Sequence, residues 1–179
     1  MNLTKMSEKD NLIHKKIGEL FKKTIPVNSN FTLLLDKACG GNQHIPLYCS
    51  SKKLKHSQYC NVDLLILKHN KIKAIVEIEA SNVKPTQICG KLLTSALCKY
   101  YIHLSEANKP IEMADSVLFI QVVDTSRLAR GKTAKFKQWK AIEASINRIL
   151  PVKGSQIKQY MLLTTDELER LDSVIRENL

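Results

Sequence analysis

The sequence predicts an α/β domain in which a central mixed β-sheet is flanked by helices. Helical and strand-like hydrophobic periodicities alternate along the chain. Two neighbouring strand segments are joined by a tight turn, and a later apolar run has the composition of a strand buried on both faces. A chain of 179 residues can bury such a core without disulfides, and no repeat or linker interrupts it. We therefore expect one domain spanning residues 1–179.

The first third of the chain is expected to form a helix followed by short strands. Residues 7–24 have the pattern of an amphipathic helix that ends before Pro26. Residues 31–35 are an apolar segment of uncertain type, Gly40-Gly41 is a loop signal, and residues 45–49 are a predicted strand. Four apolar residues mark the inward face of the helix: Ile13, Ile17, Leu20 and Phe21.

A β-hairpin is predicted next, from two strand-like segments at residues 62–67 and 72–80. The intervening His69-Asn70-Lys71 suits a tight turn because Asn accepts a left-handed backbone conformation. After the hairpin, Pro85 is suited to the first position of a helix that we expect to reach about residue 102. Residues 116–123 form the apolar run, which predicts a central strand.

The last part of the chain is expected to alternate helix, strand and helix. Residues 132–150 have a helical pattern and residues 157–163 a strand pattern. The sequence Thr164-x-x-Glu167 is a capping box, which predicts a final helix to about residue 178.

Carboxylates are concentrated on the predicted hairpin. Because strand side chains alternate between faces, Asp63 should share a face with Leu65, and Glu77 and Glu79 should share a face with Ile75. A charge buried among aliphatic residues needs a partner or a metal ion, and Mg²⁺ is bound in proteins by one or two carboxylates. The alternative interpretation is an edge hairpin whose acids face solvent and keep it soluble.

The charge balance favours polyanionic partners. The chain has 28 Lys and Arg against 17 Asp and Glu, a formal net charge of +11 and a pI near 9.5. Nucleic acid is therefore favoured over an acidic membrane surface, although a generally lysine-rich proteome would also produce this charge.

The chain has no recognisable export or membrane-spanning signal. Residues 1–10 are polar, and no apolar run approaches the roughly 18 residues that a membrane span needs. Five cysteines, an odd number, suggest reduced thiols rather than a disulfide framework. We expect a cytoplasmic protein without a membrane partner.

The hairpin resembles the core of the PD-(D/E)xK nuclease superfamily. The resemblance rests on Asn61-Val62-Asp63, on Ile75-Val76-Glu77-Ile78-Glu79 and on the helix that follows, and it covers about two thirds of the chain. It implies a restriction-endonuclease-like core in which Asp63 is the central metal ligand, Glu77 the second and the Ile78 carbonyl the third. The implied cofactor is Mg²⁺, with Mn²⁺ able to substitute.

Glu79 departs from the family pattern because it occupies the position of the usual Lys. Some restriction enzymes are similar in having E-x-E here. Glu79 could bind a second metal ion or accept a proton from the attacking water. Alternatively, Lys84 or Lys91 could restore the missing positive charge.

Two further residues are implied by the resemblance. Gln87 lies one helical step from Lys91, so both would face the metal site from the helix after the hairpin. Glu19 is similar to the acidic residue that many members contribute from their first helix. For Gln87, Lys91 and Glu19, the alternative is an ordinary solvated position on a helix.

Two basic segments are candidates for contact with DNA phosphates. The first lies before the hairpin, and the second contains no acid and has Phe136 and Trp139 interleaved with its bases. A solvated helix face, with Trp139 in the core, is the alternative that we favour for Trp139. The candidate contacts are Lys52, Lys53, Lys55, Arg127, Arg130, Lys132, Lys135, Lys137 and Lys140.

Other site chemistries have less support. The spacing of cysteines and histidines between Cys39 and Cys60 matches no paired zinc-ligand pattern, so a structural zinc is disfavoured. No G-x-S-x-G elbow and no phosphate-binding P-loop is present.

The function that the sequence predicts is Mg²⁺-dependent endonucleolytic cleavage of DNA by a restriction-type homodimer, since two-fold symmetry matches two DNA strands. A repair or junction-cleaving nuclease is a close alternative. A catalytically inactive nucleic-acid-binding protein of the same fold is the alternative from another class.

Overall fold

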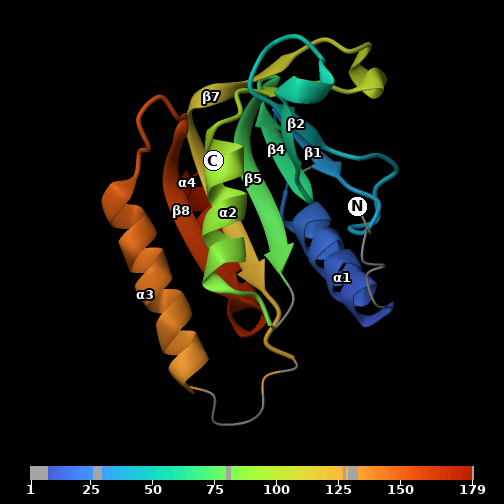
Figure 1. The fold of residues 1–179 in the computed structure, drawn as a ribbon. Helices are drawn as coiled ribbons and strands as arrows, with labels where there is room; N and C mark the ends of the chain where they lie inside the picture. Colours follow the sequence, from blue (N-terminus) through green and yellow to red (C-terminus); the bar gives the residue numbers. More distant parts are fainter. Residues whose placement is uncertain (1–7, 26–29, 80–81, 127, 129–132, 179) are drawn as a thin grey trace.

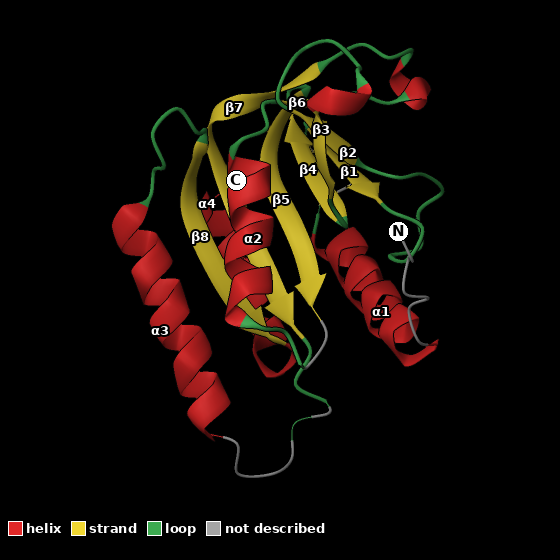
Figure 2. Cartoon of the chain, viewed as in Figure 1, coloured by secondary structure: helices red, strands yellow, loops and turns green. Residues whose placement is uncertain are grey.

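The computed structural model describes residues 8–25, 30–79, 82–126, 128 and 133–178. It confirms the predicted fold class, because a central mixed sheet is flanked by helices on both faces (Figures 1 and 2). The helices are α1 (Glu8–Thr24), α2 (Pro85–Ala96), α3 (Thr133–Ile149) and α4 (Leu171–Asn178), with short 3-10 segments η1 (Lys55–Ser57), η2 (Leu104–Glu106) and η3 (Thr165–Arg170). The strands are β1 (Phe31–Leu35), β2 (Pro46–Tyr48), β3 (Gln58–Asn61), β4 (Leu64–Lys68), β5 (Lys71–Glu79), β6 (Tyr100–Tyr101), β7 (Ile111–Val123) and β8 (Ile157–Thr164).

The long strand β7 is the centre of the sheet, as its apolar composition predicts. It pairs in parallel with β5 on one side and with β8 on the other, and its first residues pair antiparallel with β6. The strand order is β1-β4-β5-β7-β6-β2-β3, with β8 attached to β7. Because β5, β7 and β8 all run in the same direction, their carboxyl ends lie together at one end of the molecule, the lower end in Figure 1.

Each face of the sheet carries its own hydrophobic core. On one face, Ile75 of β5 packs with Ile88 of α2 and Trp139 of α3. On the other face, Val76 packs with the apolar stripe of α1 and with the apolar residues of α4. Trp139 is fully buried, which confirms the core interpretation of this residue. The alternation along β5 therefore directs Ile75 and the residues two and four positions later toward α2 and α3.

The predicted hairpin is confirmed as β4 and β5, which pair antiparallel. Its turn consists of His69 and Asn70, and both have positive φ, 49° and 58°. The first strand was predicted too early, because β4 begins at Leu64 and a separate strand, β3, ends at Asn61. Asp63 thus lies just before β4 rather than within it, where the Asp36 amide donates to its carbonyl oxygen at 2.9 Å.

The helix after the hairpin is shorter than predicted. It ends at Ala96, because the next residues join the sheet: the Lys99 amide donates to the Tyr48 carbonyl, and the Met113 amide donates to the Lys99 carbonyl. These sheet bonds replace the helical bonds that the periodicity would have continued. The short strands β3 and β6 that result were not predicted from the sequence.

The predicted C-terminal capping box is present, but the segment it opens is not a continuous α-helix. The Thr164 amide and hydroxyl both donate to Oε2 of Glu167, at 3.0 and 3.1 Å. The first turns are the 3-10 segment η3, and α4 follows it. Within the described part of the chain, no helix is long and apolar enough to cross a membrane.

The close packing of α1 against the loop after β1 generates a stability prediction. A Cβ added at Gly18 would collide with the Cys39 carbonyl oxygen, whereas a Cβ at Gly90 of α2 would meet no atom within 4 Å. We expect Gly18→Ala to destabilise the protein by roughly 1–3 kcal/mol, the usual cost of overpacking. Gly90→Ala should stabilise it by roughly 0.5–1 kcal/mol, because Ala favours a helix interior. Urea unfolding of both variants measures the two effects, and equal stabilities would contradict this packing.

Candidate active site

Two acidic residues project from the end of β5 into the core on the α2 side. Glu77 is 2% exposed and Glu79 is 7% exposed, and they share a face as the alternation predicts. The solvent-facing interpretation of the hairpin is therefore wrong for these two residues. Burying two carboxylates is costly unless each finds a partner.

The partner of both glutamates is Lys91, one turn and a half into α2. Its Nζ lies 2.8 Å from Oε2 of Glu77 and 3.1 Å from Oε1 of Glu79. The Lys91 side chain as a whole is 37% exposed, and its ammonium group lies against the two buried carboxylates. Of the two lysines suggested by the sequence, Lys91 is the one that restores the positive charge beside Glu79.

Asp63 completes the acidic group through a backbone contact. Its Oδ2 accepts a hydrogen bond of 2.7 Å from the amide of Ile78, which lies between the two glutamates. The amide and carbonyl of one strand residue point to the same side, so the Ile78 carbonyl also points toward Asp63. Leu64, the first residue of β4, pairs with Val76, so β4 does not extend alongside Ile78. Asp63 thus lies beside the last residues of β5, where β5 is no longer paired with β4.

The electrostatics of the site are those of crowded carboxylates. Burial raises the pKa of Glu77 well above its usual range, and the nearby charge of Asp63 raises it further, while Lys91 opposes the shift. Burial also disfavours the charge of Lys91, but Glu77, Asp63 and Glu79 together outweigh that effect and raise the pKa of Lys91. Lys91 thus keeps its positive charge, whereas the ionised form of Glu77 is disfavoured.

The donor set suits one additional cation. Three carboxylates lie near one ammonium group here, so acidic groups are in excess. Asp63, Glu77 and the Ile78 carbonyl are hard oxygen ligands of the kind that Mg²⁺ takes. Among the described residues, however, no three His, Cys, Asp or Glu side chains form a cluster that could hold a metal ion. Glu77 and Glu79 both face Nζ of Lys91, and Asp63 contacts the backbone of Ile78 between them. The metal-binding roles of these residues stay predictions.

The site includes two buried residues that the sequence reading missed. Nε2 of Gln121 on β7 donates to Oε1 of Glu79 at 2.9 Å, and the hydroxyl of Tyr160 on β8 donates to Oε1 of Gln121 at 2.9 Å. Gln121 is fully buried. The available signal was its position, because it is the polar residue within an otherwise apolar strand segment.

The residue that α1 brings nearest to Asp63 is a histidine rather than the expected glutamate. Nε2 of His14 lies 3.9 Å from Oδ2 of Asp63, and the residue is buried. Glu19 is exposed and forms an ion pair of 2.8 Å with Lys22. His14 lies three residues before Ile17 on the buried face of the helix, and that periodicity could have identified it.

Gln87 and Lys84 lie at the first turn of α2 and take part in capping it. Both are exposed, and Oε1 of Gln87 accepts a hydrogen bond from the Lys84 amide at 2.9 Å. This contact satisfies a free amide at the helix start. The structure thus gives Gln87 a capping contact, while Lys91, four residues later, makes the contacts with the glutamates.

The two basic segments lie at opposite ends of the sheet. The loop with Lys52, Lys53 and Lys55 is at the end where η1 lies, and α3 begins at the end where β5 finishes (Figure 1). On α3, Lys137 is exposed and Lys135 lies 5.7 Å from the Trp139 ring centre. Lys140 is ion-paired with Glu143 and Glu167, which reduces its availability to phosphate. Arg127, Arg130 and Lys132 lie outside the described residues.

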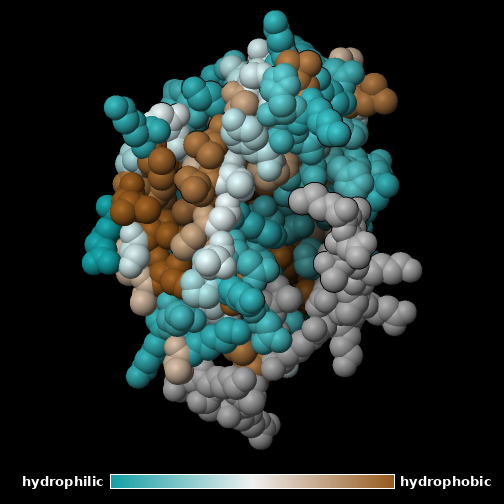
Figure 3. Space-filling model, in the orientation of Figure 1, coloured by the Kyte–Doolittle hydropathy of each residue, from teal (hydrophilic) through white to brown (hydrophobic). Residues whose placement is uncertain are grey.

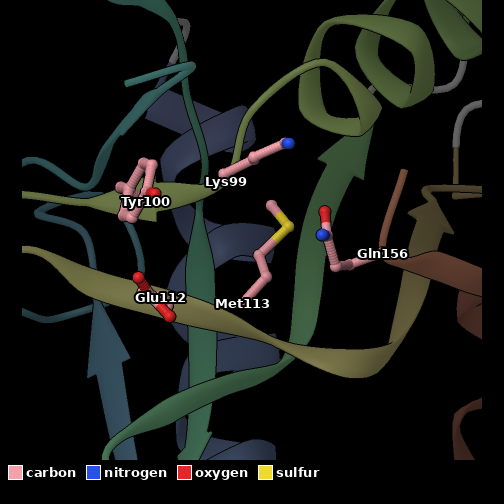
Figure 4. A pocket seen from close by; sticks show the side chains of 5 residues that line it. All are labelled: Lys99, Tyr100, Glu112, Met113 and Gln156. Carbon is pink, nitrogen blue, oxygen red and sulfur yellow. The ribbon is translucent and has the colours of Figure 1, made fainter. Parts of the chain in front are cut away.

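A cavity of about 200 Å³ lies at the other end of β7 from Gln121 (Figure 4). It lies between β6, the start of β7 and the residues before β8, so it is separate from the carboxylate site. Its lining residues are Lys99, Tyr100, Glu112, Met113 and Gln156.

The position of Lys91 generates a pH-dependent stability prediction. In the folded protein the pKa of Glu77 is raised, so between its usual value of about 4.3 and the raised value the folded state keeps a proton that the unfolded state loses. Stability therefore falls as pH rises through this window. Lys91→Met removes the group that opposes the shift, so its destabilisation should be small near pH 4 and grow toward pH 8. A loss on the order of 2 kcal/mol at pH 8 is expected, below the roughly 3–5 of a fully buried pair because Lys91 is partly exposed.

The measurement is urea unfolding at both pH values, with Lys84→Met as the matched control on the same helix. Lys84 is exposed, so its replacement should change stability little at either pH. A destabilisation by Lys91→Met that did not change with pH would contradict the pairing with Glu77.

Comparison with known proteins gives no family assignment: no family model, no curated protein and no solved structure matches the chain.

Proposed function

We propose that this protein is a Mg²⁺-dependent DNA endonuclease of the PD-(D/E)xK type, with a restriction-endonuclease-like core. The observation that carries the proposal is the placement of Lys91 between Glu77 and Glu79 at the end of β5. The Asp63 carboxylate lies beside them, bonded to the amide of Ile78. Two carboxylates and a lysine are the groups that the motif requires. Here the lysine comes from α2 instead of β5.

The contacts suggest a separate role for each residue of the site. Asp63, Glu77 and the Ile78 carbonyl would hold one Mg²⁺, which when bound polarises a phosphate and lowers the pKa of the water that attacks it. The ammonium group of Lys91 lies beside these ligands and would donate to a phosphate oxygen and stabilise the charge that develops there. Glu79 holds Lys91 in place and is not itself a metal ligand.

The contacts of Glu79 favour a role that differs from the two that the sequence left open, metal binding and proton acceptance. Its Oε1 accepts a hydrogen bond from Gln121 and forms an ion pair with Lys91, so we favour a positioning role. The same contact weakens the inactive-protein alternative, whose support was the missing motif lysine.

DNA is the proposed substrate, and restriction-type cleavage by a homodimer is the proposed activity. The net charge of +11 supports a polyanion, and α3 begins at the same end of the sheet as the carboxylates. An apolar face over α2 and α3, visible in Figure 3, supports a protein partner, for which a second copy is our proposal. A groove of about 360 Å³ between these helices is lined by Cys89 of α2 and by Ile142 and Ile149 of α3, and Ile149 is 65% exposed.

The direct test is cleavage of supercoiled plasmid, branched DNA and single-stranded DNA with Mg²⁺, with Mn²⁺ and with a chelator. We expect metal-dependent cutting, and Asp63→Asn, Glu77→Gln and Lys91→Ala should each lower the rate about a hundredfold or more. Glu79→Gln should lose a similar factor through Lys91, and Glu79→Lys should be inactive because it places two ammonium groups together. The substrate that is cut best distinguishes restriction from junction or repair activity.

The matched control is Glu112→Gln, an exposed carboxylate near the start of β7, far from the site. It should cut like the unmodified protein. Tight DNA binding without cutting under any metal condition would instead support the inactive binding protein.

A second prediction concerns the DNA-binding surface. Replacing Lys135 and Lys137 with Ala should weaken DNA binding and reduce the slope of log Kd against log salt by roughly two, since each phosphate contact contributes about 0.9. The control is the double replacement of Lys52 and Lys55 with Ala, at the opposite end of the sheet. A larger effect from that control pair would move the DNA-binding surface to the η1 end.

A further inference from the structure

A line of hydrogen bonds connects the outer strand β8 to the candidate active site. The Tyr160 hydroxyl donates to Gln121, Gln121 donates to Oε1 of Glu79, and the same oxygen forms an ion pair of 3.1 Å with Nζ of Lys91. Lys91 then reaches Glu77 at 2.8 Å. The line crosses β8, β7 and β5 and ends at the ammonium group of Lys91 on α2.

The two bonds of Gln121 fix its orientation. A carboxylate oxygen only accepts, so the side of Gln121 that faces Glu79 must be its NH₂ group. Its carbonyl oxygen then faces Tyr160, whose hydroxyl must donate. The Tyr160 ring is itself held by Phe119, with ring centres 6.0 Å apart and planes inclined by 15°. Neither side chain therefore has an alternative arrangement that keeps both bonds.

Folding alone does not require this pair. Gln121 is fully buried and Tyr160 is 4% exposed, on strands whose other buried positions, apart from Thr164 at the end of β8, are filled by apolar residues. Replacing two buried hydrogen-bond partners by apolar groups of similar shape can be nearly neutral for stability. What the pair does provide is a fixed donor to Oε1 of Glu79, the oxygen that also holds Lys91.

We propose that Gln121 and Tyr160 are positioning residues that act through Glu79 to fix the ammonium group of Lys91. The inference rests on the proposed nuclease function and extends it to residues that touch neither DNA nor metal. Without the donor from Gln121, Glu79 can turn about its side-chain bonds, and Lys91 loses one of its two anchors. A displacement of about 1 Å at a reacting group can cost a hundredfold in rate.

The kinetic test uses single-turnover cleavage with DNA affinity measured separately. Tyr160→Phe should lower the cleavage rate about tenfold and Gln121→Met about a hundredfold, both with unchanged Kd for DNA. Because both residues act along one line, adding Tyr160→Phe to Gln121→Met should have no further effect.

The matched control is Tyr101→Phe. Tyr101 is also a buried tyrosine bonded to a glutamine side chain, since Gln43 donates to its hydroxyl at 2.8 Å, but it lies on β6, away from the carboxylates. It should lose comparable stability and keep the full cleavage rate. Equal rate losses in Tyr101→Phe and Tyr160→Phe would overturn the proposal, as would independent, multiplying effects of Tyr160→Phe and Gln121→Met.

A spectroscopic measurement tests the line without relying on cleavage. In NMR spectra of the full chain without metal or DNA, Tyr160→Phe should shift the side-chain amide signals of Gln121 and the Nζ signal of Lys91, whereas Tyr101→Phe should shift neither. Unchanged Gln121 and Lys91 signals in Tyr160→Phe would overturn the positioning role. If the unmodified protein cut no DNA while these shifts appeared, the proposed nuclease function would fail and the line of bonds would stand.

Discussion

The arrangement of the site depends on the ammonium group of Lys91 and its contact with two buried carboxylates. Glu77 and Glu79 share one face of a strand that is covered by α2 and α3, so neither can reach bulk water. Two carboxylates in such a place repel each other and lose their hydration. One cation placed between them pairs with both, and the start of α2 at Pro85 sets the helix so that Lys91 reaches them.

The strands on either side of β5 place the remaining groups of the site around its last residues. Because β4 begins at Leu64, the backbone of Ile78 lacks a strand neighbour on that side, and the Asp63 carboxylate occupies the place. On the other side, β7 supplies Gln121 opposite Glu77 in the parallel register and directs it to Glu79. A parallel sheet with a gap at one strand end therefore gathers acid, amide and backbone groups around a single point, as in the ligand sites of other open α/β sheets.

The site combines rigidity with an open side. Its two glutamates are buried and paired with Lys91, whose side chain is 37% exposed, and with Asp63 nearby the acidic groups outnumber the ammonium group. Such an excess binds a divalent cation well, and a cation in turn attracts phosphate. Under the proposed function, the net charge of +11 and the locally acidic site would bind the same polyanionic substrate through different contacts.

The sequence by itself determined the features that depend on neighbouring residues: the hairpin with its His69-Asn70 turn, the shared face of Glu77 and Glu79, the central β7 and the burial of Trp139. Local periodicity and turn chemistry encode these directly. Only the tertiary structure decided that Lys91 rather than Lys84 meets the glutamates, that His14 rather than Glu19 approaches Asp63, and that Gln121 and Tyr160 join the site. Those choices depend on strand register, on the point where β4 begins and on the rotation of each helix against the sheet, and these are set by packing between segments far apart in the chain.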